Sequence, residues 1–347
     1  MGLIIKSDAP TLKSALDSFF KHEAKHLAEN TVRRYHTAAP ALLKAFGTKK
    51  INHIKPEDIE NFIKKRSNEF ACRPGRTLKN GTVIKPKPTA NKISTSSVNK
   101  ELTLLKKVIG KLFDTEVIFK NPAKNIKKLK EENEPGRVIN REEERLYLNG
   151  CNADYRDYAI ILIETGLRPQ ELAQLKISNI NLENRTLFVV KGKTKAAIRI
   201  VPLTLRALEV ISRRMQGTRS VYLFAGGRHI KSLDEAVLKY NNAHYLALKR
   251  SKIDSVNRSG VEGTTMIYSF RHTFATRFVE SGSNLITLGA LLGHADLKLL
   301  MKYSHPGDQH KFDAINFMSE QQEVLREKEQ KEREKAENES EFLKKAA

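Results

Sequence analysis

The stretch ETGLRPQELAQL, residues 164–175, decides how the second half of the chain folds. It follows a nearly continuous apolar run over residues 159–163, which is typical of a fully buried helix. Gly166 is placed to end that helix and Pro169 to begin the next one. Arg168 therefore falls in a rigid corner, from which its side chain can project instead of lying along a solvated face.

A second arginine stands in MIYSFRHTFATRF, residues 266–278. Four apolar side chains of this stretch form one helical stripe, and Tyr268 and Arg271 lie beside it, three residues apart. Arg271 is either a surface base or a partly buried guanidinium with partners, and its closeness to the stripe favours the second.

In the first stretch, Glu171 is either an ordinary carboxylate of a helix first turn or the group that orients Arg168.

A third stretch, LLGHADLKLLMKYSH at residues 291–305, contains His294 and Tyr303 around a run of leucines. By helical spacing alone, Tyr303 is predicted to be a packed core residue, because it follows Leu299 by four positions and Leu300 by three.

Over the rest of the chain, the spacing of apolar residues predicts a mainly α protein with a small antiparallel β-sheet. Residues 11–113 show helical spacing, interrupted by a long basic segment over residues 73–97 that we interpret as a loop, with a short hairpin around Asn80-Gly81 as an option. Charged residues 127–138 end in Pro135-Gly136 and are the best linker candidate. We therefore predict three parts, which are a helical domain (1–130), a mixed α+β domain (131–319) and a charged tail, helical or disordered (320–347).

Within the second domain, residues 186–190 and 198–201 are short β-type runs that flank the basic sequence KGKTK. They predict a hairpin with a basic tip. Beyond it, helical spacing returns over 203–215, 233–249, 264–279, 285–292 and 297–303.

The charge of the chain points to a polyanionic partner. Sixty-two Lys and Arg against 40 Asp and Glu give a net charge of +22, and residues 1–135 alone hold 28 basic and 14 acidic side chains. Nucleic acid is the simplest such partner.

No run has the length of a membrane span, no secretory signal is visible, and the two cysteines match no disulfide or metal framework. We expect a cytoplasmic, nucleoid-associated bacterial protein without a membrane partner.

Taken together, the motifs resemble those of the tyrosine recombinases, the family of phage integrases and Xer-type recombinases. TGLRPQEL, a strand-turn-strand with GKTK, RHTFAT, and LGH with a tyrosine nine residues later occur in the family's order between about residues 140 and 305. The helical N-terminal part resembles the family's SAM-like core-binding domain. The resemblance therefore implies that residues 1–130 are a DNA-binding domain and residues 131–319 a catalytic domain.

The resemblance implies a role for each motif residue. Arg168 and Arg271 would clamp the scissile phosphate, His294 would hydrogen-bond it, and Tyr303 would attack it to form a 3′-phosphotyrosyl link without metal, ATP or other cofactor. Lys193 would protonate the departing 5′-oxygen, and Lys191 and Lys195 are neighbours that alignment on Gly192 disfavours.

The implied partners are double-stranded DNA with inverted-repeat core sites, other copies of the chain in a tetramer on synapsed DNA (a monomer in solution), and accessory directionality proteins. With the first helix starting at about Thr11, we expect no separate arm-binding domain.

One position departs from the family pattern. The family has a histidine three residues before its second arginine, and this chain has Tyr268. A phenol donates a hydrogen bond but is a poor general base. Two alternatives therefore stay open. One is a DNA-binding relative that no longer cleaves, and the other is a topoisomerase of the type IB kind.

Overall fold

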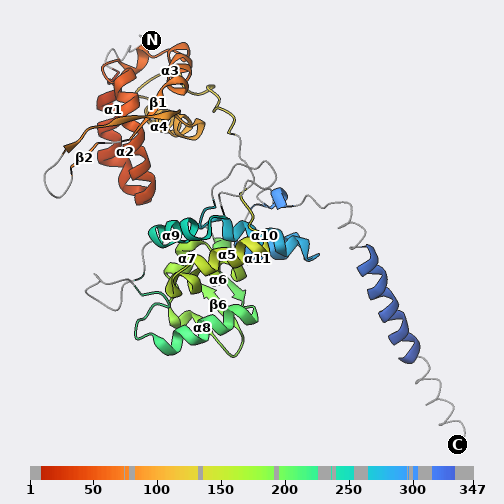
Figure 1. Cartoon of the computed structure of the whole chain (residues 1–347). Helices are drawn as coiled ribbons and strands as arrows, with labels where there is room; N and C mark the ends of the chain where they lie inside the picture. Colours follow the sequence, from red (N-terminus) through yellow and green to blue (C-terminus); the bar gives the residue numbers. More distant parts are fainter. Residues whose placement is uncertain are drawn as a thin grey trace, which may run out of the picture. The chain divides into compact units, whose positions relative to one another are not determined.

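The computed structural model describes residues 9–73, 75–77, 83–131, 136–190, 195–225, 236, 240–253, 265–294, 296, 300–303 and 315–332. The chain divides into two compact units, Met1–Asn133 and Glu134–Ala347, which are drawn in Figure 1. Among the described helices, none is long and apolar enough to cross a membrane.

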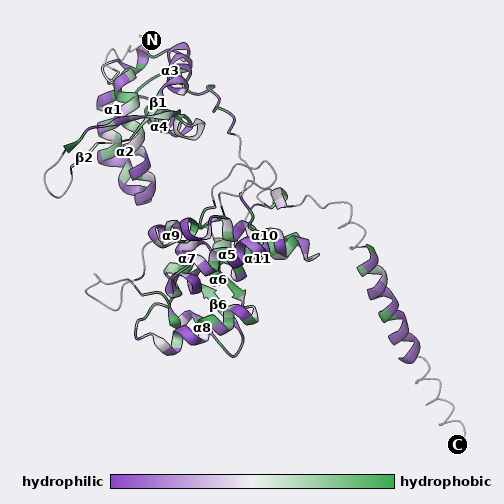
Figure 2. Cartoon of the chain, in the orientation of Figure 1, coloured by the Kyte–Doolittle hydropathy of each residue, from purple (hydrophilic) through white to green (hydrophobic). Residues whose placement is uncertain are grey.

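The first unit is built on four α-helices around one apolar core. They are α1 (Leu12–Ser18), α2 (Glu29–Phe46), α3 (Pro56–Asn68) and α4 (Thr95–Asp114). Side-chain caps start two of them, because the hydroxyls of Thr11 and Ser94 accept hydrogen bonds from backbone N–H groups three residues on. Pro56 occupies the first turn of α3, where its missing N–H costs nothing. The apolar faces of these helices meet in the interior, and the hydrophilic faces remain outside (Figure 2).

The basic segment that we interpreted as a loop differs from that expectation. β1 (Phe70–Arg73) pairs antiparallel with β4 (Lys87–Lys92), and β2 (Arg76–Thr77) pairs with β3 (Val83–Ile84). The result is a ribbon of short strands between α3 and α4. Asn80-Gly81, the expected hairpin turn, lies outside the described residues.

The second unit is mainly helical, and α6 (Ala153–Thr165) is its central helix. The helices that build the site and its surroundings are α5 (Arg141–Gly150), α7 (Pro169–Ala173), α8 (Leu205–Gly217), α9 (Asn241–Ser251), α10 (Ser269–Glu280), α11 (Leu285–Leu292) and the short 3-10 helix η8 (Met301–Tyr303). Residues 159–163 of α6 are all buried, which confirms the prediction of a fully buried helix. Helices α8 and α10 both pack against it, and Figure 1 shows α6 surrounded by its neighbours.

A three-stranded antiparallel sheet completes this unit, in the order β5 (Ile180–Asn181), β6 (Thr186–Val189) and β7 (Arg199–Pro202). The predicted hairpin is β6–β7, and β5 is an additional strand of two residues. In β7, Arg199 and Val201 face inward, with Val189 and Leu187 as their cross-strand partners. Residues 191–194 of the basic tip, Lys193 included, lie outside the described residues.

Two predicted helices begin later than expected. We predicted helices from 233 and 264, whereas α9 starts at Asn241 and α10 at Ser269. Of the predicted 297–303 helix, residues 301–303 form η8 and 297–299 are not described. In the tail, residues 315–332 form an exposed helix. The mainly helical fold with small antiparallel sheets confirms the predicted fold class.

Candidate active site

The corner after α6 is shaped by a glycine. Gly166 has a φ of 62° in the left-handed region, where a Cβ is disfavoured. A Cβ there would also lie 2.4 Å from the ring of Phe274 in α10 and 2.9 Å from Leu292 in α11. The carbonyl of Gly166 accepts a hydrogen bond of 2.8 Å from Nη1 of Arg271. This turn therefore brings α10 and α11 against the corner that carries Arg168.

Glu171 holds two arginines. Its carboxylate accepts from the backbone N–H of Arg168 at 2.9 Å and from Nη1 of the same residue at 2.7 Å. It also accepts from Nη2 and Nη1 of Arg199, at 2.9 and 3.2 Å. Burial raises the pKa of Glu171, but the hydrogen bonds from Arg199 and Arg168 outweigh burial and leave the pKa lowered. Glu171 is thus an ionised, buried bridge and not only a first-turn carboxylate.

Arg271 is buried in α10, with only 2% of its surface exposed. Nη1 donates to Gly166, as above, and Nη2 donates to the carbonyl of Leu292 at 2.6 Å and to Nε2 of His294 at 2.8 Å. Burial, followed by the positive charge of Arg168, lowers the pKa of Arg271 to about 10. The guanidinium stays charged at neutral pH, and its charge is not neutralised by the groups that hold it.

His294 follows the turn that ends α11. Gly293 there has a φ of 66°, and a Cβ on it would lie 2.9 Å from the carbonyl of Ala196 and 3.0 Å from Nη1 of Arg199. The backbone of Gly293 therefore packs against the start of β7. Because Nε2 of His294 accepts from Arg271, its imidazole is neutral in this arrangement.

Tyr303 ends η8, and its neighbour Leu300 anchors this short helix. Leu300 is 1% exposed and belongs to a small apolar cluster with Ala275, Leu288 and Leu292, against which Tyr303 packs. The phenol oxygen lies 2.6 Å from Nδ1 of His272. Burial raises the pKa of Tyr303 to about 12, although the charge of Arg271 acts in the opposite direction.

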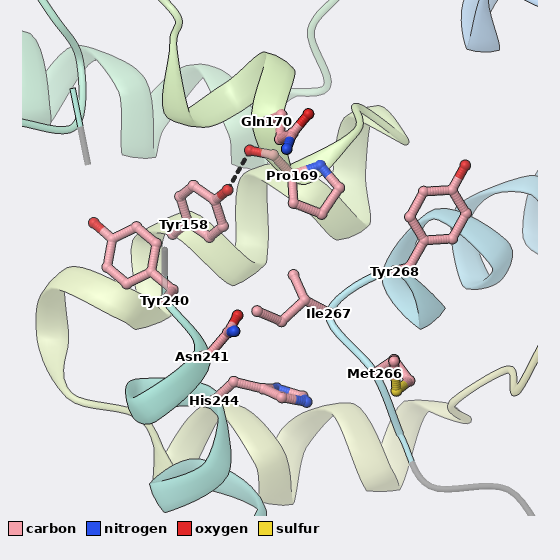
Figure 3. Close-up of a pocket in the computed structure, with 9 residues that line it drawn as sticks. All are labelled: Tyr158, Pro169, Gln170, Tyr240, Asn241, His244, Met266, Ile267 and Tyr268. Carbon is pink, nitrogen blue, oxygen red and sulfur yellow. Dashed lines mark hydrogen bonds between the residues drawn. The ribbon is translucent and has the colours of Figure 1, made fainter. Parts of the chain in front are cut away.

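Tyr268 caps the N-terminus of α10 and is 42% exposed. Its ring meets that of His272 edge-on, at 5.4 Å between centroids. Tyr268 also lines one edge of a pocket of about 430 Å³ beside the corner residues Pro169 and Gln170. Figure 3 shows this pocket, with the hydroxyl of Tyr158 donating to the carbonyl of Pro169 on its far wall.

The structure thus gathers Arg168, Glu171, Arg271, His294 and Tyr303 into one site, with Tyr268 at its edge. Lys193 falls outside the described residues.

Sequence reasoning missed two residues of this site, Arg199 and His272. A signal existed for both, because Arg199 lies at an inward position of a predicted strand and His272 directly follows Arg271 in the sequence. What the sequence did not show was which side chains they would contact.

Comparison with known proteins identifies the family. The model of the phage integrase family matches residues 137–310, half of the chain, and that of the phage integrase N-terminal SAM-like domain matches residues 11–66. The chain therefore belongs to the phage integrase family of tyrosine recombinases. At the level of this class, the prediction of an enzyme that cleaves and rejoins DNA is confirmed.

Relatives and solved structures agree with this assignment. The integrase of Escherichia phage P2 is 29% identical over 65% of the chain and 59% of its own length. A tyrosine recombinase of Thermosipho africanus is 24% identical over 86% of the chain and 95% of its own length.

Among structures, the Tn1549 transposon integrase bound to transposon right-end DNA has a TM-score of 0.68 at 18% identity, covering 89% of this chain and all of that chain. A lambda integrase tetramer bound to a Holliday junction has a TM-score of 0.63 at 17% identity, covering 84% and 80%. At these identities the likeness concerns the fold.

Proposed function

We propose that this protein is a site-specific DNA recombinase in which Tyr303 is the nucleophile and Arg168 and Arg271 bind the scissile phosphate. The observation that carries the proposal is the arrangement around Arg271. Its buried, charged guanidinium is held by two carbonyls and the neutral imidazole of His294. The positive charge of this guanidinium also acts to lower the pKa of Tyr303. A phosphate diester is an anion that such a site would stabilise.

In the proposed reaction, Oη of Tyr303 bonds to phosphorus as the bond from phosphorus to the 5′-oxygen breaks. Lys193 gives its proton to that oxygen, and a 3′-phosphotyrosyl link and a free 5′-hydroxyl result. The link conserves the energy of the broken ester, so the 5′-hydroxyl of a partner strand can attack it without ATP or a metal ion.

Two residues receive positioning roles in this proposal. Glu171 would orient Arg168 through the hydrogen bonds described above. For His294 we expected a direct bond to the phosphate. Nε2 of His294 lies 2.8 Å from Nη2 of Arg271, so we propose that His294 acts by holding this guanidinium.

The partners are proposals of the same kind. The Tn1549 integrase bound to transposon right-end DNA and the lambda integrase tetramer on a Holliday junction support DNA as the partner and oligomerisation on DNA. We further propose duplex DNA with inverted-repeat core sites and a tetramer on synapsed DNA. The basic ribbon β1–β4 of the first unit would contribute phosphate contacts.

A nicked suicide duplex, which traps the covalent intermediate, tests the proposal. The wild-type chain is expected to give a protein–DNA adduct that survives denaturing electrophoresis, and Tyr303→Phe to give none. An adduct that persists in Tyr303→Phe would refute the assignment of the nucleophile. Absence of any adduct from the wild type would favour a non-cleaving DNA-binding relative, and relaxation of plasmids without strand exchange would favour a topoisomerase.

A further inference from the structure

Tyr303 has a close neighbour that the family motifs did not identify. Nδ1 of His272 lies 2.6 Å from the phenol oxygen, a distance typical of a strong hydrogen bond. The two rings are 5.9 Å apart between centroids and inclined by 44°, so the contact is made through the polar atoms and not by stacking. His272 comes from α10 and Tyr303 from η8, 31 residues later.

The imidazole is held from two further directions. A Cβ on Gly136 would lie 2.1 Å from Cδ2 and 2.3 Å from Nε2 of His272, so the backbone ahead of α5 covers that edge of the ring. Tyr268, one helical turn before His272, meets the ring edge-on. The edge of the ring that carries Cδ2 and Nε2 thus lies against Gly136, and the other ring nitrogen, Nδ1, faces Tyr303.

The proposed reaction needs a group in this place. Burial raises the pKa of Tyr303 to about 12, so at neutral pH the nucleophile carries its proton, which must leave as the bond to phosphorus forms. Tyr268 stands where the family pattern has a histidine, and a phenol is a poor proton acceptor. An imidazole is a suitable base near neutral pH.

We propose that His272 is the general base of strand cleavage. The inference rests on the proposed function and deepens it. In the neutral tautomer with its proton on Nε2, His272 accepts the phenolic proton at Nδ1 as the Oη–phosphorus bond forms and the 5′-oxygen departs with a proton from Lys193. In rejoining, the 5′-hydroxyl returns its proton to Lys193 as it attacks phosphorus. The imidazolium then returns its own proton to the departing phenolate, which restores all groups.

The decisive comparison is between His272→Asn and the wild type, in single-turnover cleavage of the nicked duplex at saturating protein. Asparagine keeps an oxygen that can accept a hydrogen bond from the phenol but cannot take its proton. We expect cleavage by His272→Asn to slow by about 100-fold or more, with DNA affinity unchanged in a gel-shift titration. Thr276→Ala, one turn further along α10, is the matched control and is expected to cleave like the wild type.

A second measurement separates proton transfer from positioning. Installing 3-fluorotyrosine at position 303 lowers the pKa of the nucleophile, so its proton leaves more readily without a base. In the His272→Asn background it is expected to restore cleavage by about tenfold, and in the wild type to change it little.

Three results would overturn the inference. They are cleavage by His272→Asn within about threefold of the wild type, cleavage faster than the wild type, and no response of that variant to the fluorotyrosine. If the wild type forms no adduct that depends on Tyr303, the proposed function fails and this inference with it. If the wild type forms the adduct and His272→Asn forms it equally fast, the inference alone fails.

Discussion

The bridge at Glu171 gives the sharpest test of how the site is held. We consider Glu171→Gln, which keeps the shape of the side chain but removes its charge and replaces one oxygen with an NH2 donor. That donor would face Arg168 or Arg199, which also donate. The side chains of Glu171 and Arg199 are 8% and 6% exposed, and that of Arg168 is 32% exposed.

The magnitude follows from this burial. Removing one partner of a buried ion pair leaves an uncompensated charge and costs about 3–5 kcal/mol. With a urea m-value of about 2 kcal/mol/M, the unfolding midpoint of the second unit should fall by about 1.5–2.5 M. Cleavage should fall by about 100-fold, because Arg168 would no longer be fixed in the corner.

Near-UV circular dichroism of tyrosine can follow the second unit within the intact chain. Of the nine tyrosines, Tyr35 alone lies in the first unit, and the chain has no tryptophan. Tyr147, Tyr155 and Tyr158 are buried in the second unit and provide the signal. Cleavage is measured on the nicked duplex.

Glu142→Gln is the matched control. Glu142 and Arg145 form an ion pair with the same three-residue spacing, but their side chains are 52% and 61% exposed. Loss of this ion pair should leave the urea unfolding midpoint and the cleavage rate unchanged, because exposed pairs are screened by water. If Glu171→Gln moved the midpoint no more than this control does, the idea that a buried charge bridge holds Arg168 and Arg199 would be wrong.

Two further predictions concern acid stability and salt dependence. Burial raises the pKa of Glu144, but hydrogen bonds from Arg206 and Arg277 outweigh it and leave the pKa below its ordinary value of 4.5. The stabilisation is therefore present above pH 4.5 and lost as the pH falls through the lowered pKa. Glu144→Gln should cost about 3 kcal/mol at pH 7, at the low end for a buried pair because Arg206 is partly exposed, and this difference should narrow in acid unfolding curves. In the basic ribbon, replacing Lys85 and Lys87 together by glutamine should reduce the slope of log affinity against log salt by about two, and an unchanged slope would count against phosphate contacts there.

Local chemistry made much of the site predictable. A glycine that ends one helix and a proline that begins the next define the corner of Arg168 wherever the rest of the chain lies. An arginine beside an apolar stripe was expected to be buried with partners, and Arg271 is. The glycine and the proline lie within three positions of Arg168, and the apolar stripe that predicts the burial of Arg271 lies on its own helix. The hydrogen-bond partners of Arg271, Gly166 and Leu292 among them, lie far from it along the chain and were not predicted.

Pairings between distant residues were not predictable in this way. Arg199 lies 28 residues from Glu171, and His272 lies 31 residues from Tyr303. Periodicity places a side chain on a face of its own element but does not say which other element covers that face. The strands of the ribbon in the first unit were not predicted from the sequence for a related reason. Its strands are short, and the pairing of β1 with β4 is irregular between Phe70 and Cys72, so no alternation of apolar residues marks them.

The same distant pairings set the charge of the site. Arg168 and Arg199 share the carboxylate of Glu171, and the guanidinium of Arg271 lies close enough for its pKa to respond to the charges of all three. The groups that hold Arg271 are two carbonyls and a neutral imidazole, which satisfy its donors without cancelling its charge. The site therefore carries an excess of about two positive charges and is largely buried. The attraction between this charge and an approaching phosphate would be stronger there than in water. A phosphodiester in its pentavalent transition state gathers further negative charge, so this excess favours that state over the ground state. In the proposed reaction Glu171 would have a double role, because it compensates the charge of the buried Arg199 and still leaves a net positive charge for the phosphate.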